Sequence, residues 1–156
     1  MPTHFDGSAR EKRSLDLFIK LIRAAASVEA RTSAPLAAAG LTTSQFGALE
    51  TLYYVGPLPA GRLAEKHLKS PNNFTVVITN LEKRGLVRRE KAPHDRRVVM
   101  IELTDAGREV VEAIMPSYVR TVVDDLDRLT AAEQEHLADL LRKVGRAQRP
   151  ADLGRT

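Results

Sequence analysis

SPNNFTVVITNLEKRGLVRREKAPHDRRVVMIEL, residues 70–103, is the stretch of sequence that decides the fold. Ser70 followed by Pro71 is typical of a helix start, because serine caps the free N–H groups and proline fits the first turn. Apolar side chains then return every three or four residues, at Phe74, Val77, Ile78 and Leu81. This spacing predicts a helix that runs to about Arg84 and ends at Gly85.

The second half of this stretch predicts a β-hairpin. Residues 86–90 and 98–103 are two short runs that contain β-branched and other apolar side chains, and the segment between them, 91–97, is polar, basic and contains a proline. Two such runs joined by a polar loop are typical of paired strands. The hairpin therefore follows directly after the predicted helix.

Helices are predicted before this stretch at 11–33, at 42–55 and, as a short segment, from Pro59. Pro35 and Gly40 separate the first two, and Thr42 with Gln45 forms a capping box for the second. The order of helix, short helix, helix and hairpin is that of a winged helix-turn-helix. The predicted fold class is therefore mainly α with a small β-hairpin wing.

Two more helices are predicted after the hairpin. Thr104 caps the first, which runs to about residue 127 and contains Pro116, a residue that should kink the helix or mark a packing contact. Thr130 and Glu133 form a capping box for the last helix, which runs to 146. Residues 147–156 are expected to be a flexible tail.

Composition excludes several classes of protein. The 156 residues include no cysteine, which rules out disulfides, thiolate metal sites and sensing of oxidants by a thiol. The chain has no apolar run long enough for a membrane span and no apolar segment typical of a secretory signal. Motifs for nucleotide, metal or nucleophilic catalysis are also missing. We therefore expect a soluble intracellular protein that is not an enzyme and needs no cofactor.

Basic residues concentrate in the middle of the chain. Residues 56–103 carry ten basic and five acidic groups, a net charge of +5, whereas the whole chain carries +4. A local excess of positive charge is typical of a surface that binds nucleic acid. A solvated charged face would explain the charge alone equally well.

The predicted helix at 70–84 has an outward face suited to reading DNA. Asparagine can pair with adenine, and threonine or valine methyl groups can contact the methyl group of thymine. Ser70 and the free N–H groups of the helix start can meet a phosphate. The alternative is an ordinary polar helix surface, but these residue types are mediocre helix formers. The candidate base-reading residues are Asn72, Asn73, Thr75, Val76, Thr79, Asn80 and Lys83.

Three further motifs resemble those of the MarR family of bacterial transcriptional regulators. Asp95-Arg96-Arg97 followed by Leu103-Thr104-Asp105-Ala106-Gly107 resembles the D-x-R…L-T-x-x-G signature of that family. Leu81-Glu82-Lys83-Arg84-Gly85-Leu86-Val87 is similar to its junction between recognition helix and wing. The resemblance covers about residues 11–146. It implies that Arg97 enters the minor groove, oriented by Asp95, and that Arg96 contacts phosphate.

The resemblance also implies a homodimer on a pseudo-palindromic DNA site. It assigns residues 1–10 to a flexible N-terminus, 11–40 and 104–146 to dimerisation helices, and 41–103 to the DNA-binding winged helix-turn-helix. Apolar stripes on the terminal helices agree with this division. The candidate dimerisation residues are Leu15, Phe18, Ile22, Val119, Val122, Leu126, Leu137, Leu140, Leu141 and Val144. Further candidate phosphate contacts are Arg62, Lys69, Arg88, Arg89 and Lys91.

Regulation by a small aromatic or phenolic ligand is typical of repressors in this family. The candidate lining of a ligand pocket is Phe18, Ile22, Tyr53, Tyr54, Met115 and Tyr118, although for each residue taken alone a core position is the more common explanation. The four histidines, His4, His67, His94 and His136, are scattered and are expected to lie at the surface rather than to bind a metal. The predicted function is a cytoplasmic, nucleoid-associated repressor. The alternative is a winged-helix module that binds another protein without binding specific DNA.

Overall fold

The computed structural model describes residues 4–67, 71–92 and 94–146, and these form a mainly helical chain with one small sheet. The elements are α1 (Ala9–Thr32), α2 (Ala34–Ala38), α3 (Thr43–Val55), β1 (Leu58–Pro59), α4 (Ala60–Lys66), α5 (Pro71–Lys83), β2 (Val87–Lys91), β3 (Val99–Leu103), α6 (Asp105–Leu126) and α7 (Ala131–Arg146). The sheet is antiparallel in the order β1-β3-β2. The predicted fold class is confirmed.

The helix starts follow the predicted capping residues. Thr42 and Gln45 form a reciprocal capping box at α3, and Thr130 and Glu133 exchange the same contacts before α7. A further capping box at Ser8 starts α1 at Ala9, so the N-terminal segment expected to be flexible ends earlier than residue 10. Side chains that bond the free N–H groups of a first turn typically stabilise a helix by about 1 kcal/mol.

Two short elements, α2 and β1, are not indicated by the sequence patterns. Pro35 does not only end the first helix, because it occupies the first turn of a second one, α2, where proline fits without strain. Strand β1 has only two residues, too few to show an alternating pattern, and its existence depends on pairing between Leu58 and Ile101. The helix α6 continues through Pro116, whose side chain is exposed.

One aliphatic core joins the winged helix-turn-helix to the flanking helices. It contains Phe46, Leu49 and Leu52 of α3, Leu63 of α4, Phe74, Ile78 and Leu81 of α5, and Ile101 of β3. Leu36 of α2 and Val111 and Ile114 of α6 belong to the same cluster. Each such side chain contributes roughly 1.5–3 kcal/mol when fully buried. The core therefore extends beyond residues 41–103 at both ends.

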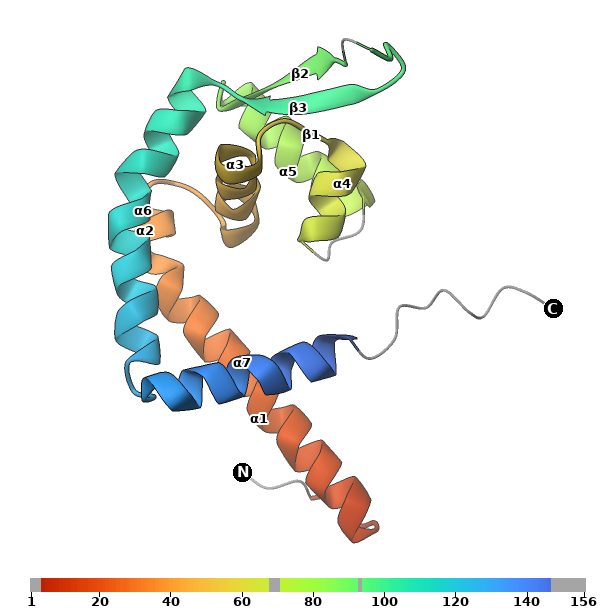
Figure 1. Ribbon diagram of the computed structural model, residues 1–156, viewed down its shortest axis with the longest axis vertical. Coiled ribbons are helices and arrows are strands. Elements are labelled where there is room, and N and C mark those ends of the chain that lie inside the picture. Colours follow the sequence, from red (N-terminus) through yellow and green to blue (C-terminus); the bar gives the residue numbers. More distant parts are fainter. Residues whose placement is uncertain (1–3, 68–70, 93, 147–156) are drawn as a thin grey trace, which may run out of the picture.

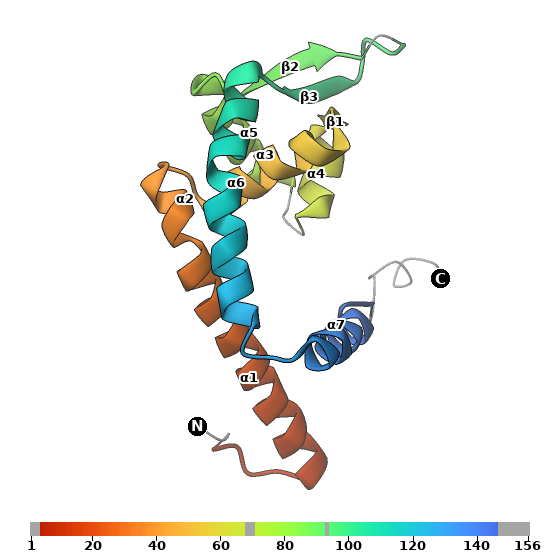
Figure 2. The same ribbon diagram turned by 60° about the vertical axis from the view of Figure 1, so that its left-hand side comes forward.

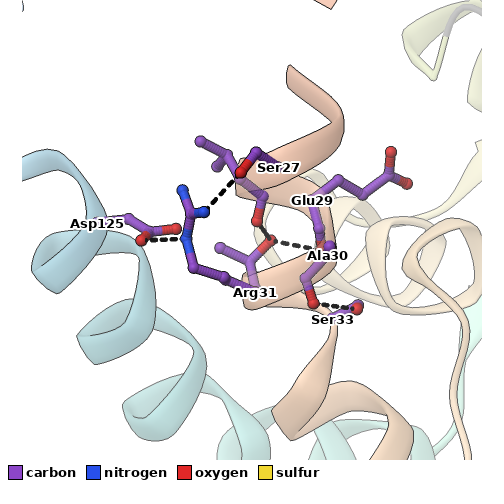
Figure 3. A network of polar contacts seen from close by, with 8 residues as sticks. Ser27, Glu29, Ala30, Arg31, Ser33 and Asp125 are labelled. Atoms are coloured by element: carbon purple, nitrogen blue, oxygen red, sulfur yellow. Dashed lines mark hydrogen bonds and ion pairs between the residues drawn. The ribbon is translucent and has the colours of Figure 1, made fainter. Parts of the chain in front are cut away.

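The remaining helices form an arm that leads away from this core (Figure 1). The helix α6 runs from the sheet along the length of the molecule, and α7 turns away from its far end (Figure 2). An ion pair fastens α1 to α6, where Arg31 Nε lies 2.5 Å from Asp125 Oδ1 (Figure 3). Ser27 Oγ accepts a second hydrogen bond from the Arg31 guanidinium at 2.7 Å. The Asp125 side chain is only 7% exposed, whereas the Arg31 side chain is 41% exposed, so water reaches the pair from the arginine side.

The start of α6 packs against the turn between α5 and β2. The Thr104 hydroxyl donates to the carbonyl of Gly85 at 2.7 Å and accepts from the N–H of Gly107 at 3.0 Å. A Cβ atom on Gly107 would lie 2.1 Å from the Leu86 carbonyl oxygen. Only glycine therefore allows α6 to approach the backbone at this junction.

Gly107→Ala should lower the free energy of unfolding by about 1–3 kcal/mol, the usual cost of overpacking a rigid site. Gly145→Ala is the matched control, because a Cβ atom there meets nothing within 4 Å. Alanine in a helix interior should stabilise by up to about 1 kcal/mol. Urea denaturation of both variants measures the difference. A Gly107→Ala variant as stable as the parent would contradict the tight junction.

Candidate nucleic-acid interface

The helix α5 has one buried face and one exposed face. Phe74, Ile78 and Leu81 are at most 1% exposed, and they fix the helix to the core. On the opposite side, Thr75, Val76, Asn80 and Lys83 are exposed and Thr79 is half-buried. Val76 is 61% exposed although it is apolar, which leaves its methyl groups available for contact. Lys69, Ser70 and the side chains of Asn72 and Asn73 lie outside the described residues.

His67 positions the start of α5 from inside the helix-turn-helix. Its ring stacks on Phe74, with centroids 5.3 Å apart and an angle of 11° between the planes. Its Nε2 atom lies 3.0 Å from the Thr51 hydroxyl oxygen. A Cβ atom on Gly47 would meet the ring at 2.8 Å, so glycine leaves room for it. The expectation that His67 is a surface histidine is therefore wrong, because its ring lies at the end of α4 in contact with both Thr51 of α3 and Phe74 of α5.

The other end of α5 is held by Arg84, a residue that sequence reasoning did not assign to any contact. Its guanidinium donates to the carbonyl oxygen of Gly40 at 2.8 Å and to that of Ala39 at 3.4 Å. These carbonyls follow α2, so the contact joins two segments that are far apart in the sequence. Only the fold brings them together, and no local motif could have indicated it.

The wing is the hairpin of β2 and β3, which projects from one end of the molecule (Figures 1 and 2). Its register pairs Val87 with Leu103 and Lys91 with Val99. At the tip, Asp95 Oδ1 accepts a hydrogen bond of 2.9 Å from the backbone N–H of Arg97. Asp95 therefore shapes the turn through the backbone, as aspartate commonly does. Within the described residues it forms no ion pair with the Arg97 guanidinium, contrary to expectation.

The basic side chains near α5 and the wing fall into two groups. Arg62, Arg88 and Arg89 are each paired, with Glu65 at 2.7 Å, with Glu102 at 2.9 Å and with Glu82 at 2.8 Å. Among the residues that the structure describes, the side chains of Lys83, Lys91, Arg96 and Arg97 form no ion pair. The uncompensated positive charge therefore lies at the end of α5 and at the outer part of the wing.

The six aromatic and apolar residues expected to line a ligand pocket do not come together. Tyr118 lies in a groove of about 500 Å³ with residues of α1, α6 and α7. Tyr53 instead donates to Glu112 at 3.0 Å and lies beneath the Arg108 guanidinium. Tyr54 is exposed, and Met115 packs on the core.

Phe18 and Ile22 do not line this groove, and both are exposed. The residues of α1 that line it recur at three- and four-residue spacing, the pattern that also predicts the helix. The lining consists of Leu21, Ala24, Ala25, Val28, Glu29, Thr32, Thr43, Tyr118, Leu126, Leu137 and Leu141.

The candidate dimerisation residues form unusually exposed apolar surface. Phe18 is 57% exposed and Val144 is 55% exposed. Leu15 and Val122 are half-buried, whereas the others are exposed. Large exposed apolar patches usually mark sites of association. The exposed members are Phe18, Ile22, Val119, Leu126, Leu137, Leu140, Leu141 and Val144.

Glu50 is a half-buried carboxylate on α3. It forms no hydrogen bond or ion pair with the described part of the chain. Burial raises its pKa above the ordinary 4.5. Burial and the charge of Glu50 together raise the pKa of the Tyr118 hydroxyl. The charged form of Glu50 is therefore disfavoured in the folded chain.

Comparison with known proteins agrees with this geometry. The sequence model of the MarR family matches residues 41–99. The HTH-type transcriptional regulator MhqR of Bacillus subtilis is 31% identical over 134 residues, which cover 86% of this chain and 92% of the relative. The chain belongs to the MarR family. It is a DNA-binding transcriptional regulator, and its relatives are regulators rather than enzymes.

Solved structures of similar proteins have the same architecture. Sco3205, a MarR family transcriptional regulator from Streptomyces coelicolor solved in complex with DNA, is 29% identical, with a TM-score of 0.84. That match covers 97% of this chain and 96% of Sco3205. BpsR of Bordetella bronchiseptica is 26% identical, with a TM-score of 0.77, and the match covers 95% of this chain and 100% of BpsR.

In the described part of this MarR-family chain, no group of three or more histidine or acidic residues could hold a metal ion. None of its described helices combines the length and the apolarity that a membrane span requires.

Glu50→Gln should raise the melting temperature near neutral pH. Because the folded pKa is raised, ionisation of Glu50 costs stability as pH rises from below 4.5 through the folded pKa. The advantage of the variant should therefore be present at about pH 7 and vanish below about pH 4. Thermal melts across this range test it, with Glu135→Gln at an exposed position of α7 as the control. A pH-independent difference would contradict the assignment.

Proposed function

We propose that the chain acts as a homodimer that binds a pseudo-palindromic DNA duplex. The main support is the division of α5 into two faces. Its apolar face is buried, and its opposite face presents small polar and β-branched side chains. A helix that enters the major groove needs such a surface. Sco3205, which shares the architecture, was solved in complex with DNA.

The proposed contacts divide by chemistry. Thr75, Val76, Thr79 and Asn80, together with Asn72 and Asn73, read base edges in the major groove. Arg97 enters the adjacent minor groove, where a narrow groove has enhanced negative potential. Phosphate contacts fix the register of the protein on the duplex. We assign them to Lys69, Ser70, Lys91 and Arg96, and also to Lys83, which the sequence placed among the base-reading residues but which lies at the far end of α5. Arg62 and Arg88 would reach phosphate only by sharing or leaving their acidic partners.

The dimer follows from the exposed apolar face of the arm. Residues 11–40 and 104–146 supply this face. Residues 41–103 supply the DNA-binding part, which we call the reader, although α2 and the start of α6 also pack in its core. Burial of the face against a second copy would place two α5 helices on one side of the dimer. Their spacing should match half-sites about one DNA turn apart.

Regulation by a small aromatic or phenolic molecule completes the proposal, with the protein acting as a repressor. BpsR, whose DNA binding is regulated by 6-hydroxynicotinic acid, supports a ligand of this kind. The groove beside Tyr118 is largely apolar and is bordered by α6, which also carries core residues of the reader. A ligand there would act by binding the DNA-free conformation more tightly than the DNA-bound one.

Arg97→Ala should weaken binding to the selected duplex by about 1–3 kcal/mol, as expected for loss of a base-groove contact. The loss should be larger when the flanking base pairs are A·T, because a narrow minor groove attracts arginine. Selection from a random duplex pool followed by fluorescence titration measures both effects. Arg142→Ala, on α7 and paired with Asp139, is the control. Unchanged affinity for Arg97→Ala would remove the minor-groove assignment.

Leu141→Asp should convert the dimer to a monomer, because a charge would enter the apolar face of α7. Sedimentation should give about 34 kDa for the parent, twice the chain mass of 17.2 kDa, and about half of that for the variant. Arg142→Gln lies on the opposite face of α7 and should remain dimeric. A monomeric parent that binds no duplex at low salt would instead favour a protein-interaction module.

A further inference from the structure

The two consecutive arginines at the base of the wing point to opposite faces of the hairpin. Arg89 pairs in register with Ile101, which is fully buried, whereas Arg88 pairs with Glu102. Residues directly opposite each other in an antiparallel pair share a face. Arg89 therefore lies on the face that packs towards α5, and Arg88 lies on the other.

Arg89 bridges the wing and the recognition helix. Its Nη1 atom lies 2.8 Å from Glu82 Oε2, and its Nη2 atom donates to the Thr79 hydroxyl oxygen at 3.3 Å. Both Arg89 and Glu82 are only about one-third exposed, at 37% and 36%. A guanidinium presents several donors in one plane, so it can hold a carboxylate and a hydroxyl at the same time.

Thr79, which accepts this hydrogen bond, is one of the residues that we propose to read bases. It shares the outward face of α5 with Val76 and Lys83, which lie three and four residues away along the helix. Threonine in a helix divides between two rotamers, because its hydroxyl can bond a backbone carbonyl of the preceding turn. Among the described residues, the Thr79 hydroxyl makes no such bond and instead accepts from Arg89.

We propose that Arg89 is a positioning residue that selects the Thr79 rotamer for base reading, with Glu82 as its anchor, and is not a phosphate contact. A hydroxyl has one donor and two acceptor sites, so Thr79 keeps its donor free. In the major groove that donor suits an acceptor on a base edge, such as a purine N7 or the O4 of thymine. This inference rests on the proposed function and changes the role predicted for Arg89 from the sequence.

The two roles of Arg89 predict different responses to salt. Each phosphate contact releases counterions and contributes about 0.9 to the slope of log affinity against log salt concentration. The Glu82 carboxylate already offsets the charge of Arg89, so a positioning arginine should leave this slope unchanged. Lys91 has no acidic partner among the described residues and lies two positions further along β2, which makes it a matched phosphate contact.

The test uses the full-length chain and its selected duplex. Affinity is measured over a salt series for Arg89→Met, Arg89→Lys, Thr79→Val, the double variant Arg89→Met with Thr79→Val, and Lys91→Met. The same proteins are titrated against every single-base-pair variant of one half-site. Thermal melts show that each variant is folded, and Arg89→Lys, which keeps the charge, replaces Arg89→Met if the latter is not.

Arg89→Met and Thr79→Val should each lower discrimination about 3- to 10-fold at the same base pair, the effect of one hydrogen bond. The double variant should lose no more than either single variant, because both act through one contact. Arg89→Lys should also lose discrimination, because an ammonium cannot hold both partners in the same plane. The salt slope should fall for Lys91→Met only.

Three results would overturn the assignment of Arg89. They are a salt slope that falls for Arg89→Met as it does for Lys91→Met, a uniform loss of affinity on all duplexes, or losses at different base pairs for Arg89 and Thr79. A parent protein that binds no duplex with sequence preference would overturn the proposed function as well. The behaviour of the parent therefore separates the two failures.

Discussion

Burial of one face of α5 is the constraint on which the rest of the structure depends. Phe74, Ile78 and Leu81 enter the core that α3, α4 and β3 build around them. These side chains cannot leave the core without exposing a large apolar surface. The rotation of α5 about its axis is therefore fixed, and its opposite face is directed outward. The stack of His67 on Phe74 and the bonds of Arg84 to the end of α2 hold the two ends of the same helix.

The helix α6 connects that core to the arm. Its first half contributes Val111 and Ile114 to the core, and its second half carries exposed apolar residues and the partner of Arg31. The close approach of Gly107 to Leu86 holds the start of α6 against the turn that follows α5. Because α6 is one continuous helix, we propose that a change in the arm on ligand binding would reach residues 41–103 through it.

Local signals made part of this structure predictable. The periodicity of α5, the capping box at Thr42 and the two short runs of the hairpin with their polar loop are local signals, so the sequence alone indicates them. Strand β1, the pairing of Arg89 with Glu82 and the contacts of Arg84 require segments that only the fold brings together. Of the six candidate pocket residues only Tyr118 lies in the groove, because the groove is formed where faces of α1, α6 and α7 meet, which no local pattern indicates.

We propose that two copies of α5 read one duplex in the major groove with the wings beside it. Chemical footprinting of the selected duplex is the most direct test, with methylation of guanine N7 probing the major groove and hydroxyl radicals probing the minor-groove edge. Two major-groove patches about 10–10.5 base pairs apart, or a multiple of this, are expected, each bordered by minor-groove protection. One patch alone, or protection of the minor groove only, would contradict it.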